Sequence, residues 1–459
     1  MAFGSSGPVE RRFWHHPGMT DPHPVCIIGA GLSGMTAAKH LLERGIPFDW
    51  FEIGSSYGGN WRYDNDNGRS AAYASLYIDT SKDRFAFADL PMPKPWPNYP
   101  HHTQVLEYLG KYMQTFDLGN LVSYRHEVML AEPTGDSWMV TVRNLADDSE
   151  SANLYRAVIV ANGHHWAPNL PATDGPFAGE ILHAQQYRSP EAFIGQDVVV
   201  VGAGNTGVDI ASELSWHARS VTVATRSGAH VLPRYLFGRP LDSFSTRSSA
   251  KLPLSVQRAL YGSLLFLSRG RQQSYGFPEP DSPVLAQHPT VNQEFLRLVK
   301  DGQIGVRRDV SRTTETDVVF ADGTSKRCDV IIYATGYRIS FPFLDDDVLP
   351  VEDNDVALYK RIVPPDIEGL YFVGLIQPVG ALPPLVEQQA RWVAQQIDGR
   401  DLPTPAMMKA AIERDRAAID AQYDDRPRHT IQVDYWSYLD EMRQLCDDND
   451  AKDLPFSPG

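Results

Sequence analysis

The stretch Val25-Cys-Ile-Ile-Gly-Ala-Gly-Leu-Ser-Gly34 joins a short apolar run to the spacing G-x-G-x-x-G, and Val198-Val-Val-Val-Gly-Ala-Gly-Asn-Thr-Gly207 repeats it. A strand that turns through glycines into a helix places free backbone N–H groups and the positive end of the helix dipole beside a pyrophosphate. Glycine is needed in the turn because a side chain would hold the phosphate away. The duplicated pattern therefore predicts two dinucleotide-binding units in one chain.

The residues after the first glycine turn predict the rest of a β-α-β unit. Apolar side chains recur at helical spacing over 35–44, and Gly45 then ends the helix. A second strand is expected over 48–51, and Glu52 follows it, eighteen residues past Gly34. A carboxylate at this place accepts hydrogen bonds from a ribose diol. The first unit therefore suits FAD.

The second unit repeats the pattern with one change. A helix is expected over 208–214 and a strand over 220–225, after which Arg226 stands nineteen residues past Gly207. A guanidinium at this place can pair with a 2′-phosphate, which a carboxylate would repel. The second unit therefore suits NADP in preference to NAD, and the alternative for Arg226 is a solvated surface arginine.

These units define the expected fold class, an α/β protein with two nested Rossmann-like dinucleotide-binding domains. An N-terminal arm (1–22) precedes the first part of the FAD-binding domain (23–165), and an NADPH-binding domain with a helical insertion follows (166–327). The chain then returns to the FAD-binding domain and ends in a C-terminal tail (328–459). Further elements are expected as strands at 157–163, 329–337 and 370–374 and as helices at 255–268 and 385–396.

Composition narrows the range of partners. Hydrophobic residues make up 42% of the 459 residues, which is typical of a folded globular protein. The formal net charge is −15, so neither nucleic acid nor an anionic membrane surface is an expected partner. No apolar segment combines the length of a membrane span with freedom from proline and glycine.

The three cysteines, Cys26, Cys328 and Cys446, lie far apart in the sequence. Their spacing excludes a disulfide framework, a zinc ribbon and a C-x-x-C redox pair, and a reducing cytoplasm is the expected location. The pairs His101-His102 and His164-His165 have no carboxylate or cysteine at ligand spacing, so no metal site is expected.

Several motifs between and around the two units resemble one family. The segment Phe177-Ala-Gly179-Glu-Ile-Leu-His183-Ala-Gln-Gln-Tyr187 fits the fingerprint F-x-G-x-x-x-H-x-x-x-Y/F. Further matches are Gly58-Gly59-Asn-Trp61, Asp79-Thr-Ser-Lys82, Ala334-Thr-Gly-Tyr337 and Gly374-Leu-Ile-Gln377. The chain resembles the flavin-containing monooxygenases, the class B flavoprotein monooxygenases, in a soluble bacterial-type form.

The resemblance implies an NADPH- and O2-dependent reaction. NADPH reduces FAD, and the reduced flavin captures O2 as a C4a-hydroperoxide, which oxygenates an amine nitrogen or a sulfide sulfur of a small molecule. Baeyer–Villiger oxygenation of a ketone is the alternative. A chain with two dinucleotide sites has two other interpretations, a non-oxygenating FAD/NAD(P)H reductase and a sensor that binds the cofactors without turnover. The resemblance also allows a homodimer.

The resemblance also implies the residues of the site. Asp79 and Asn205 are the expected catalytic residues. The expected cofactor-binding residues are Gly29, Gly31, Gly34, Glu52, Gly59, Trp61, Lys82, Val128, Gln377, Gly202, Gly204, Thr206, Gly207, Arg226, Ser227 and Arg234. The linker fingerprint contributes Phe177, Gly179, His183 and Tyr187, and His183 is expected to hold the linker rather than to transfer a proton.

Asp79 departs from the family pattern, which usually has asparagine there, on the C4a side of the flavin. An asparagine amide donates a hydrogen bond, whereas an ionised carboxylate only accepts. Asp79 is therefore expected to be protonated, to face a ribose hydroxyl or a lysine, or to serve another purpose. The Baeyer–Villiger branch carries an aspartate near the flavin, but its fingerprint ends in Trp where this chain has Tyr187.

Overall fold

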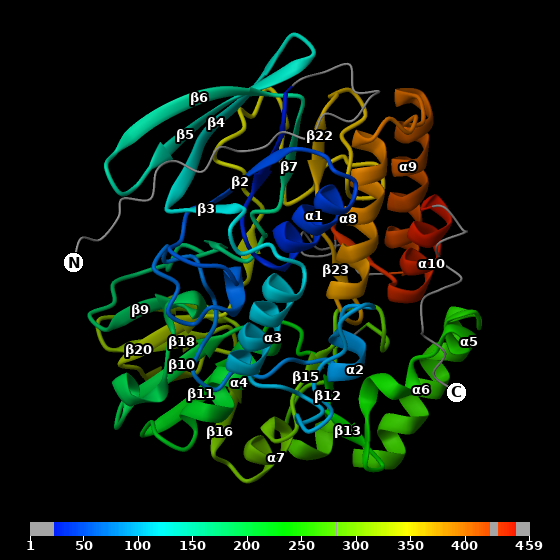
Figure 1. Cartoon of the computed structure of the whole chain (residues 1–459). Helices are drawn as coiled ribbons and strands as arrows, with labels where there is room; N and C mark the ends of the chain where they lie inside the picture. The colour runs from blue at the N-terminus through cyan, green and yellow to red at the C-terminus, as the bar shows by residue number, and fades with distance from the viewer. Residues whose placement is uncertain (1–22, 281, 423–429, 447–459) are drawn as a thin grey trace, which may run out of the picture.

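Two parallel five-stranded sheets form the frame of the protein. The computed structural model describes residues 23–280, 282–422 and 430–446. The first sheet lies in the upper half of the view in Figure 1 and the second in the lower half. The expected N-terminal arm, 1–22, lies outside the described residues.

The first sheet has the strand order β22-β7-β1-β2-β3. Its strands are β1 (Val25–Ile28), β2 (Phe48–Glu52), β3 (Val122–Tyr124), β7 (Ala157–Val160) and β22 (Leu370–Phe372). Successive side chains of β1 point to opposite faces. Val25 and Ile27 pack with α1 (Leu32–Glu43) and α8 (Pro383–Ile397), while Cys26 and Ile28 pack with the antiparallel strands β4 to β6.

The second sheet has the order β16-β11-β10-β20-β9 and the same construction. Its strands are β9 (Glu180–His183), β10 (Asp197–Val201), β11 (Ser220–Ala224), β16 (Ile304–Arg307) and β20 (Val330–Tyr333). Val198 and Val200 pack with α4 (Asn205–Leu214), whereas Val199 and Val201 pack with the antiparallel strands β17 to β19. Each glycine motif therefore stands in a strand–helix–strand unit whose other face is covered by a three-stranded meander.

The remaining elements connect and cover the two sheets. The meanders are β4 (His126–Thr134), β5 (Ser137–Asn144), β6 (Ser149–Tyr155), and β17 (Val310–Thr313), β18 (Asp317–Phe320), β19 (Ser325–Arg327). The further helices are α2 (Lys82–Phe85), α3 (His102–Thr115), α5 (Arg247–Ala250), α6 (Leu254–Arg269), α7 (Phe295–Lys300), α9 (Pro405–Gln422) and α10 (Tyr435–Leu445).

Eight short strands form two-residue pairings. They are β8 (Ala167–Pro168) with β21 (Tyr337–Arg338), β12 (Val231–Leu232) with β15 (Thr290–Val291), β13 (Tyr235–Leu236) with β14 (Arg239–Pro240), and β23 (Gln377–Pro378) with β24 (Gln432–Val433).

The expected α/β fold with two Rossmann-type sheets is confirmed. The segment 370–374 returns to the first sheet, since β22 pairs with β7. The second sheet extends past the expected boundary at 327, because β20 pairs with β10 from Val330 to Tyr333. The chain therefore crosses back to the first sheet after β20. Within the described ranges, the helices fall short of the length and apolarity that a bilayer span requires.

Candidate functional site

The first glycine turn is shaped by close contacts between backbone atoms. Gly29 has a φ of +102°, and a Cβ there would lie 2.6 Å from the carbonyl oxygen of Ala161. A Cβ on Gly34 would lie 1.9 Å from the carbonyl oxygen of Gly29, so only glycine lets α1 pack this closely against β1. Gly31 and Gly59 face each other, with a Cβ on Gly59 only 3.1 Å from the Cα of Gly31. The turn is a backbone surface without side chains at the N-terminus of α1.

The second glycine turn repeats this geometry. Gly202 has a φ of +115°, and a Cβ there would lie 2.4 Å from the carbonyl oxygen of Ala334. A Cβ on Gly207 would lie 2.4 Å from the carbonyl oxygen of Gly202, whereas Gly204 has open space around it. Asn205 begins α4, and its Oδ1 accepts a hydrogen bond from the Val291 amide at 2.7 Å.

The charged residues at the end of β2 and just after β11 have opposite signs, as expected. Glu52 is 4% exposed, and its carboxylate accepts hydrogen bonds from the amides of Ala30 and Gly54, both at 2.7 Å. The Arg226 side chain is 83% exposed and lies 3.9 Å from Asp309. Glu52 is thus fixed against the first glycine turn, and Arg226 extends into solvent beside the second sheet.

The His183 and Tyr187 side chains of the linker fingerprint are fixed by hydrogen bonds within the second unit. His183 is buried, its Nε2 lies 3.0 Å from the Gly336 carbonyl oxygen, and its Nδ1 accepts from the Gln185 amide at 3.1 Å. Burial lowers the pKa of His183. The Tyr187 hydroxyl donates to Glu213 at 2.6 Å. Both ring nitrogens of His183 are occupied by the backbone, which leaves neither ready for proton transfer.

The other two fingerprint residues form the turn before β9. A Cβ on Gly179 would lie 2.4 Å from the Asp329 carbonyl oxygen and 2.6 Å from the Phe177 ring. Phe177 packs against the apolar cluster under β20.

Asp79 belongs to a cluster that bridges the two halves. Its carboxylate lies 3.6 Å from the guanidinium of Arg234, which lies 4.0 Å from Asp209 on α4. The rings of Tyr77 and Tyr99 lie 5.8 and 5.9 Å from the same guanidinium. We call Asp79, Arg234 and Asp209, with the side chains that bind them, the Arg234 cluster.

The carboxyl groups of the Arg234 cluster titrate abnormally. Loss of hydration, followed by the charge of Asp209, raises the pKa of Asp79 to about 7 against the opposing effect of Arg234. Burial also raises the pKa of Asp209, while Arg234 and the hydrogen bonds from Tyr73 and Asn292 lower it. Perturbed groups of this kind gather at functional sites as well as in structural ion pairs.

The other expected cofactor-binding residues have the following places. Trp61 packs edge-to-face with Phe85, with 5.6 Å between the ring centroids. Val128, in β4, is buried in the apolar cluster between the first meander and the first sheet. The Lys82 ammonium donates to the carbonyl oxygens of Lys94 and Trp96, both at 2.6 Å. Gln377 starts β23, and Thr206 and Ser227 are half-buried on the second unit. The roles of these residues toward a cofactor stay predictions, and the Lys82 ammonium is already occupied by main-chain oxygens.

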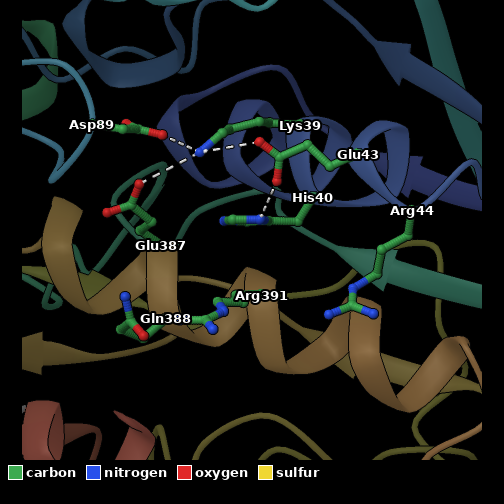
Figure 2. A pocket seen from close by; sticks show the side chains of 8 residues that line it. All are labelled: Lys39, His40, Glu43, Arg44, Asp89, Glu387, Gln388 and Arg391. Carbon is green, nitrogen blue, oxygen red and sulfur yellow. Dashed lines mark hydrogen bonds and ion pairs between the residues drawn. The ribbon is translucent and has the colours of Figure 1, made fainter. Parts of the chain in front are cut away.

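A polar cavity lies away from both glycine turns, between α1 and α8. Its volume is about 450 Å³, and Figure 2 shows its lining. Lys39 points toward Asp89, Glu43 and Glu387, at 3.6 Å from Glu43 and 3.7 Å from Glu387. We call these four residues the Lys39 cluster. One ammonium group lies among three carboxyl groups, so the cavity is a polar seam between helices. Among the described residues, no group of side chains has the composition of a metal site.

Two observations show that the residues fit the expected cofactors. The middle glycines of the two turns, Gly31 and Gly204, leave backbone free of side chains beside the N-termini of α1 and α4. Asp79 Oδ1 and Arg234 Nε are buried polar atoms without a hydrogen-bond partner at the junction of the halves. Such atoms call for a partner, because an unpaired buried polar atom is costly.

Comparisons with known proteins agree with this geometry. The family model described as flavin-binding monooxygenase-like matches residues 23–452. The chain belongs to this family. Flavin-containing monooxygenase 5 of Rattus norvegicus is 36% identical over 443 residues, which cover 92% of this chain and 82% of that protein. Dimethylaniline monooxygenase (N-oxide-forming) 2 of Rattus norvegicus is 37% identical over 439 residues, with coverages of 91% and 81%.

Solved structures show the same architecture. The S-allyl-L-cysteine S-oxygenase from Allium sativum superposes with a TM-score of 0.70 at 26% identity, covering 92% of this chain and 88% of that one. NADP⁺-bound cyclohexanone monooxygenase from Rhodococcus sp. Phi1 has a TM-score of 0.71 at 18% identity, with coverages of 94% and 98%, and shows the fold alone. The chain is therefore a flavin-dependent monooxygenase, an oxidoreductase whose cofactors are FAD and NADPH.

Sequence reasoning missed part of the Arg234 cluster. Asp209 stands in the run Val208-Asp-Ile-Ala-Ser of α4, where a charged residue is flanked by buried apolar ones. That charge between buried apolar residues was the available signal. Tyr73 and Asn292, which bind Asp209, gave no comparable signal because both residue types are common on surfaces.

Proposed function

We propose that the protein oxygenates a soft nucleophile, the amine nitrogen or sulfide sulfur of a small molecule, with NADPH and O2 as co-substrates. The relatives named for N-oxide formation and for S-oxygenation support this substrate class. The observation that carries the proposal is the pair of glycine cradles on two parallel sheets, joined by the fingerprint that ends in Tyr187. That arrangement suits two dinucleotides bound in one molecule.

Each part of the site has a role that follows from its chemistry. FAD, reduced by NADPH, supplies the activation of O2. The N-termini of α1 and α4 would bind the two pyrophosphates, and Glu52 would accept from the ribose of the flavin nucleotide. Arg226 would pair with the 2′-phosphate of NADPH, because its guanidinium is charged and solvent-exposed. Asn205, at the start of α4, would hold the loop that carries Val291 against the second cradle.

Ketone oxygenation is the second candidate function, and the pairing of Asp79 with Arg234 favours it. A guanidinium held at the junction of the halves stabilises negative charge on a reacting group. Oxygenation of a ketone needs an anionic oxidant, whereas oxygenation of a sulfide or amine does not. The choice between the two candidates therefore depends on whether Asp79 is ionised, because an ionised Asp79 offsets the charge of Arg234.

A product-identified assay tests the proposal. The purified protein is expected to be yellow, to consume NADPH and O2 together, and to convert a thioether to its sulfoxide or a tertiary amine to its N-oxide. Parallel reactions receive one sulfide, one tertiary amine and one cyclic ketone. A lactone as the main product would replace the proposal with the second candidate. NADPH oxidation with disulfide or quinone reduction and no oxygenated product would overturn both.

A further inference from the structure

Two carboxyl groups of the Arg234 cluster share one guanidinium. Arg234 Nη2 lies 3.6 Å from Asp79 and 4.0 Å from Asp209. The Asp209 and Arg234 side chains are 12% and 20% exposed, and Asp79 is 31% exposed. Two carboxylates beside a single cation in a poorly hydrated site repel each other, which favours a state in which one of them holds a proton.

The hydrogen bonds decide which carboxyl group is ionised. Asp209 Oδ2 accepts from the Tyr73 hydroxyl at 2.8 Å, and Oδ1 accepts from the Asn292 side-chain amide at 2.7 Å. Both oxygens therefore face donors, which stabilise the carboxylate form. Asp79 Oδ1 is buried and makes no hydrogen bond, and Arg234 Nη2, at 3.6 Å, is the only cation that faces it among the described residues, whereas Asp209 has two donors besides the same cation. The proton is thus better placed on Asp79.

We propose that Asp209 is a positioning residue that sets the charge of Asp79, so that Asp209 is the counter-ion of Arg234 and Asp79 is a neutral carboxylic acid. In that form Asp79 is a hydrogen-bond donor. Asp79 then supplies the group that asparagine supplies in the usual family pattern. Its use as a donor toward the cofactors rests on the proposed function, whereas the position of the proton does not.

The charged groups around Asp79 agree with this assignment. Burial, and after it the charge of Asp209, raises the pKa of Asp79 to about 7, whereas Arg234 lowers it. Burial also raises the pKa of Asp209, to which the charge of Glu213 on α4 adds, while Arg234 and the Tyr73 hydroxyl lower it. Asp79 therefore changes charge close to neutral pH, and its donor function is lost as the pH rises through about 7.

Infrared difference spectroscopy on the FAD-loaded full chain tests the proton directly. Between about pH 5 and 9, the wild type is expected to lose a protonated-carboxyl C=O band with a midpoint of about 7. Asp79→Asn removes that band and supplies the baseline, which includes the titration of Glu387. In Asp209→Asn the midpoint is expected to fall by about one unit, a tenfold loss of proton affinity, because Arg234 then serves Asp79 alone.

Two further variants keep the test decisive. Tyr73→Phe removes one donor from Asp209, which moves part of the proton from Asp79 to Asp209, so the band that Asp79→Asn removes is expected to be weaker than in the wild type; this test applies even if Asp209→Asn does not fold. Asp317→Asn removes a carboxylate on β18, away from the cluster, and should leave the midpoint in place. The proposal is overturned by an unchanged or raised midpoint in Asp209→Asn together with an undiminished Asp79 band in Tyr73→Phe, or by a band in Asp79→Asn that is as strong as that of the wild type.

The release of H2O2 per NADPH consumed separates this proposal from the proposed function. In the wild type the ratio is expected to increase when the pH exceeds about 7. In Asp209→Asn the increase should begin at a lower pH, and in Asp79→Asn the ratio should not depend on pH. If no variant oxygenates any substrate but the infrared midpoints shift as stated, the proposed function fails and the assignment of the proton stands. If the midpoints do not shift while products form, the assignment fails alone.

Discussion

The Lys39 cluster and the Arg234 cluster are each one cation surrounded by carboxyl groups, but they join different parts of the molecule. Lys39, 6% exposed, ties α1 to α8 within one domain through Glu387, also 6% exposed. Arg234 ties the second domain to Asp79 of the first and is more exposed, at 20%. Lys39 is surrounded by its partners, whereas Arg234 Nε and Asp79 Oδ1 have no hydrogen-bond partner. The Lys39 ammonium therefore needs no ligand as a partner, whereas the Arg234 cluster leaves polar atoms with which a ligand can pair.

The largest expected effect is the loss of protein stability when the Lys39 cluster is broken. Lys39→Met leaves Asp89 and Glu387 without their cation in a poorly hydrated seam, so the free energy of unfolding should fall by about 3–5 kcal/mol. Urea denaturation monitored by circular dichroism measures this change. The matched control is Lys111→Met, whose exposed pair with Glu107 should contribute less than about 1 kcal/mol. A loss below about 1 kcal/mol in Lys39→Met would show that the cluster is not essential to stability.

Breaking the Arg234 cluster should affect catalysis more than stability. Arg234→Ala is expected to lower kcat/KM for NADPH oxidation about 10- to 100-fold, because it removes the cation that joins the two halves at the junction of the cofactor sites. Steady-state kinetics at saturating O2 measures the effect. Arg297→Ala, which breaks an exposed pair with Asp301 on α7, is the control and should leave kcat/KM within about twofold. Equal losses in the two variants would contradict the comparison.

The Lys39 cluster should also make stability depend on pH. Burial, followed by the charge of Asp89, raises the pKa of Glu387 from 4.5 to about 7. The folded state thus binds this proton more tightly than the unfolded state does. Stability contributed by the protonated form is present below about pH 4.5 and is lost as the pH rises through about 7.

Glu387→Gln tests that linkage. The wild type should lose about 2 kcal/mol of unfolding free energy more than Glu387→Gln between about pH 5 and 8. Denaturation curves at several pH values supply the comparison. A variant curve parallel to that of the wild type would mean that Glu387 is ionised throughout this range.

The smallest expected effect distinguishes the two arginines proposed for cofactor binding. Arg226→Ala should raise the KM for NADPH about fivefold and leave that for NADH almost unchanged, because an exposed guanidinium pairs with the 2′-phosphate alone. Arg234→Ala should affect both nucleotides similarly, since its partners are carboxylates of the protein. Initial rates with each nucleotide decide between them. Equal effects of Arg226→Ala on the two KM values would remove its phosphate role.

The units around the glycine turns could be predicted from the sequence because their determinants are local. The strand, the three glycines and the helix lie within about twenty residues, and the first and third glycine of each turn are required by contacts with its own helix or a neighbouring strand. The boundary at 327 was less accurate, since nothing local distinguishes β20 from a strand of the first sheet. Arg234 was expected as a cofactor-binding residue, and the structure places it beside Asp79.

What the sequence alone determined is therefore the pair of dinucleotide units, their opposite charges at Glu52 and Arg226, and the family. What only the tertiary structure decided is the Arg234 cluster, whose members Asp79, Asp209 and Arg234 come from two domains. A glycine turn is specified by backbone sterics over a few residues. The charge of a carboxyl group depends on every cation and donor within a few ångströms, and these approach only when the chain has folded.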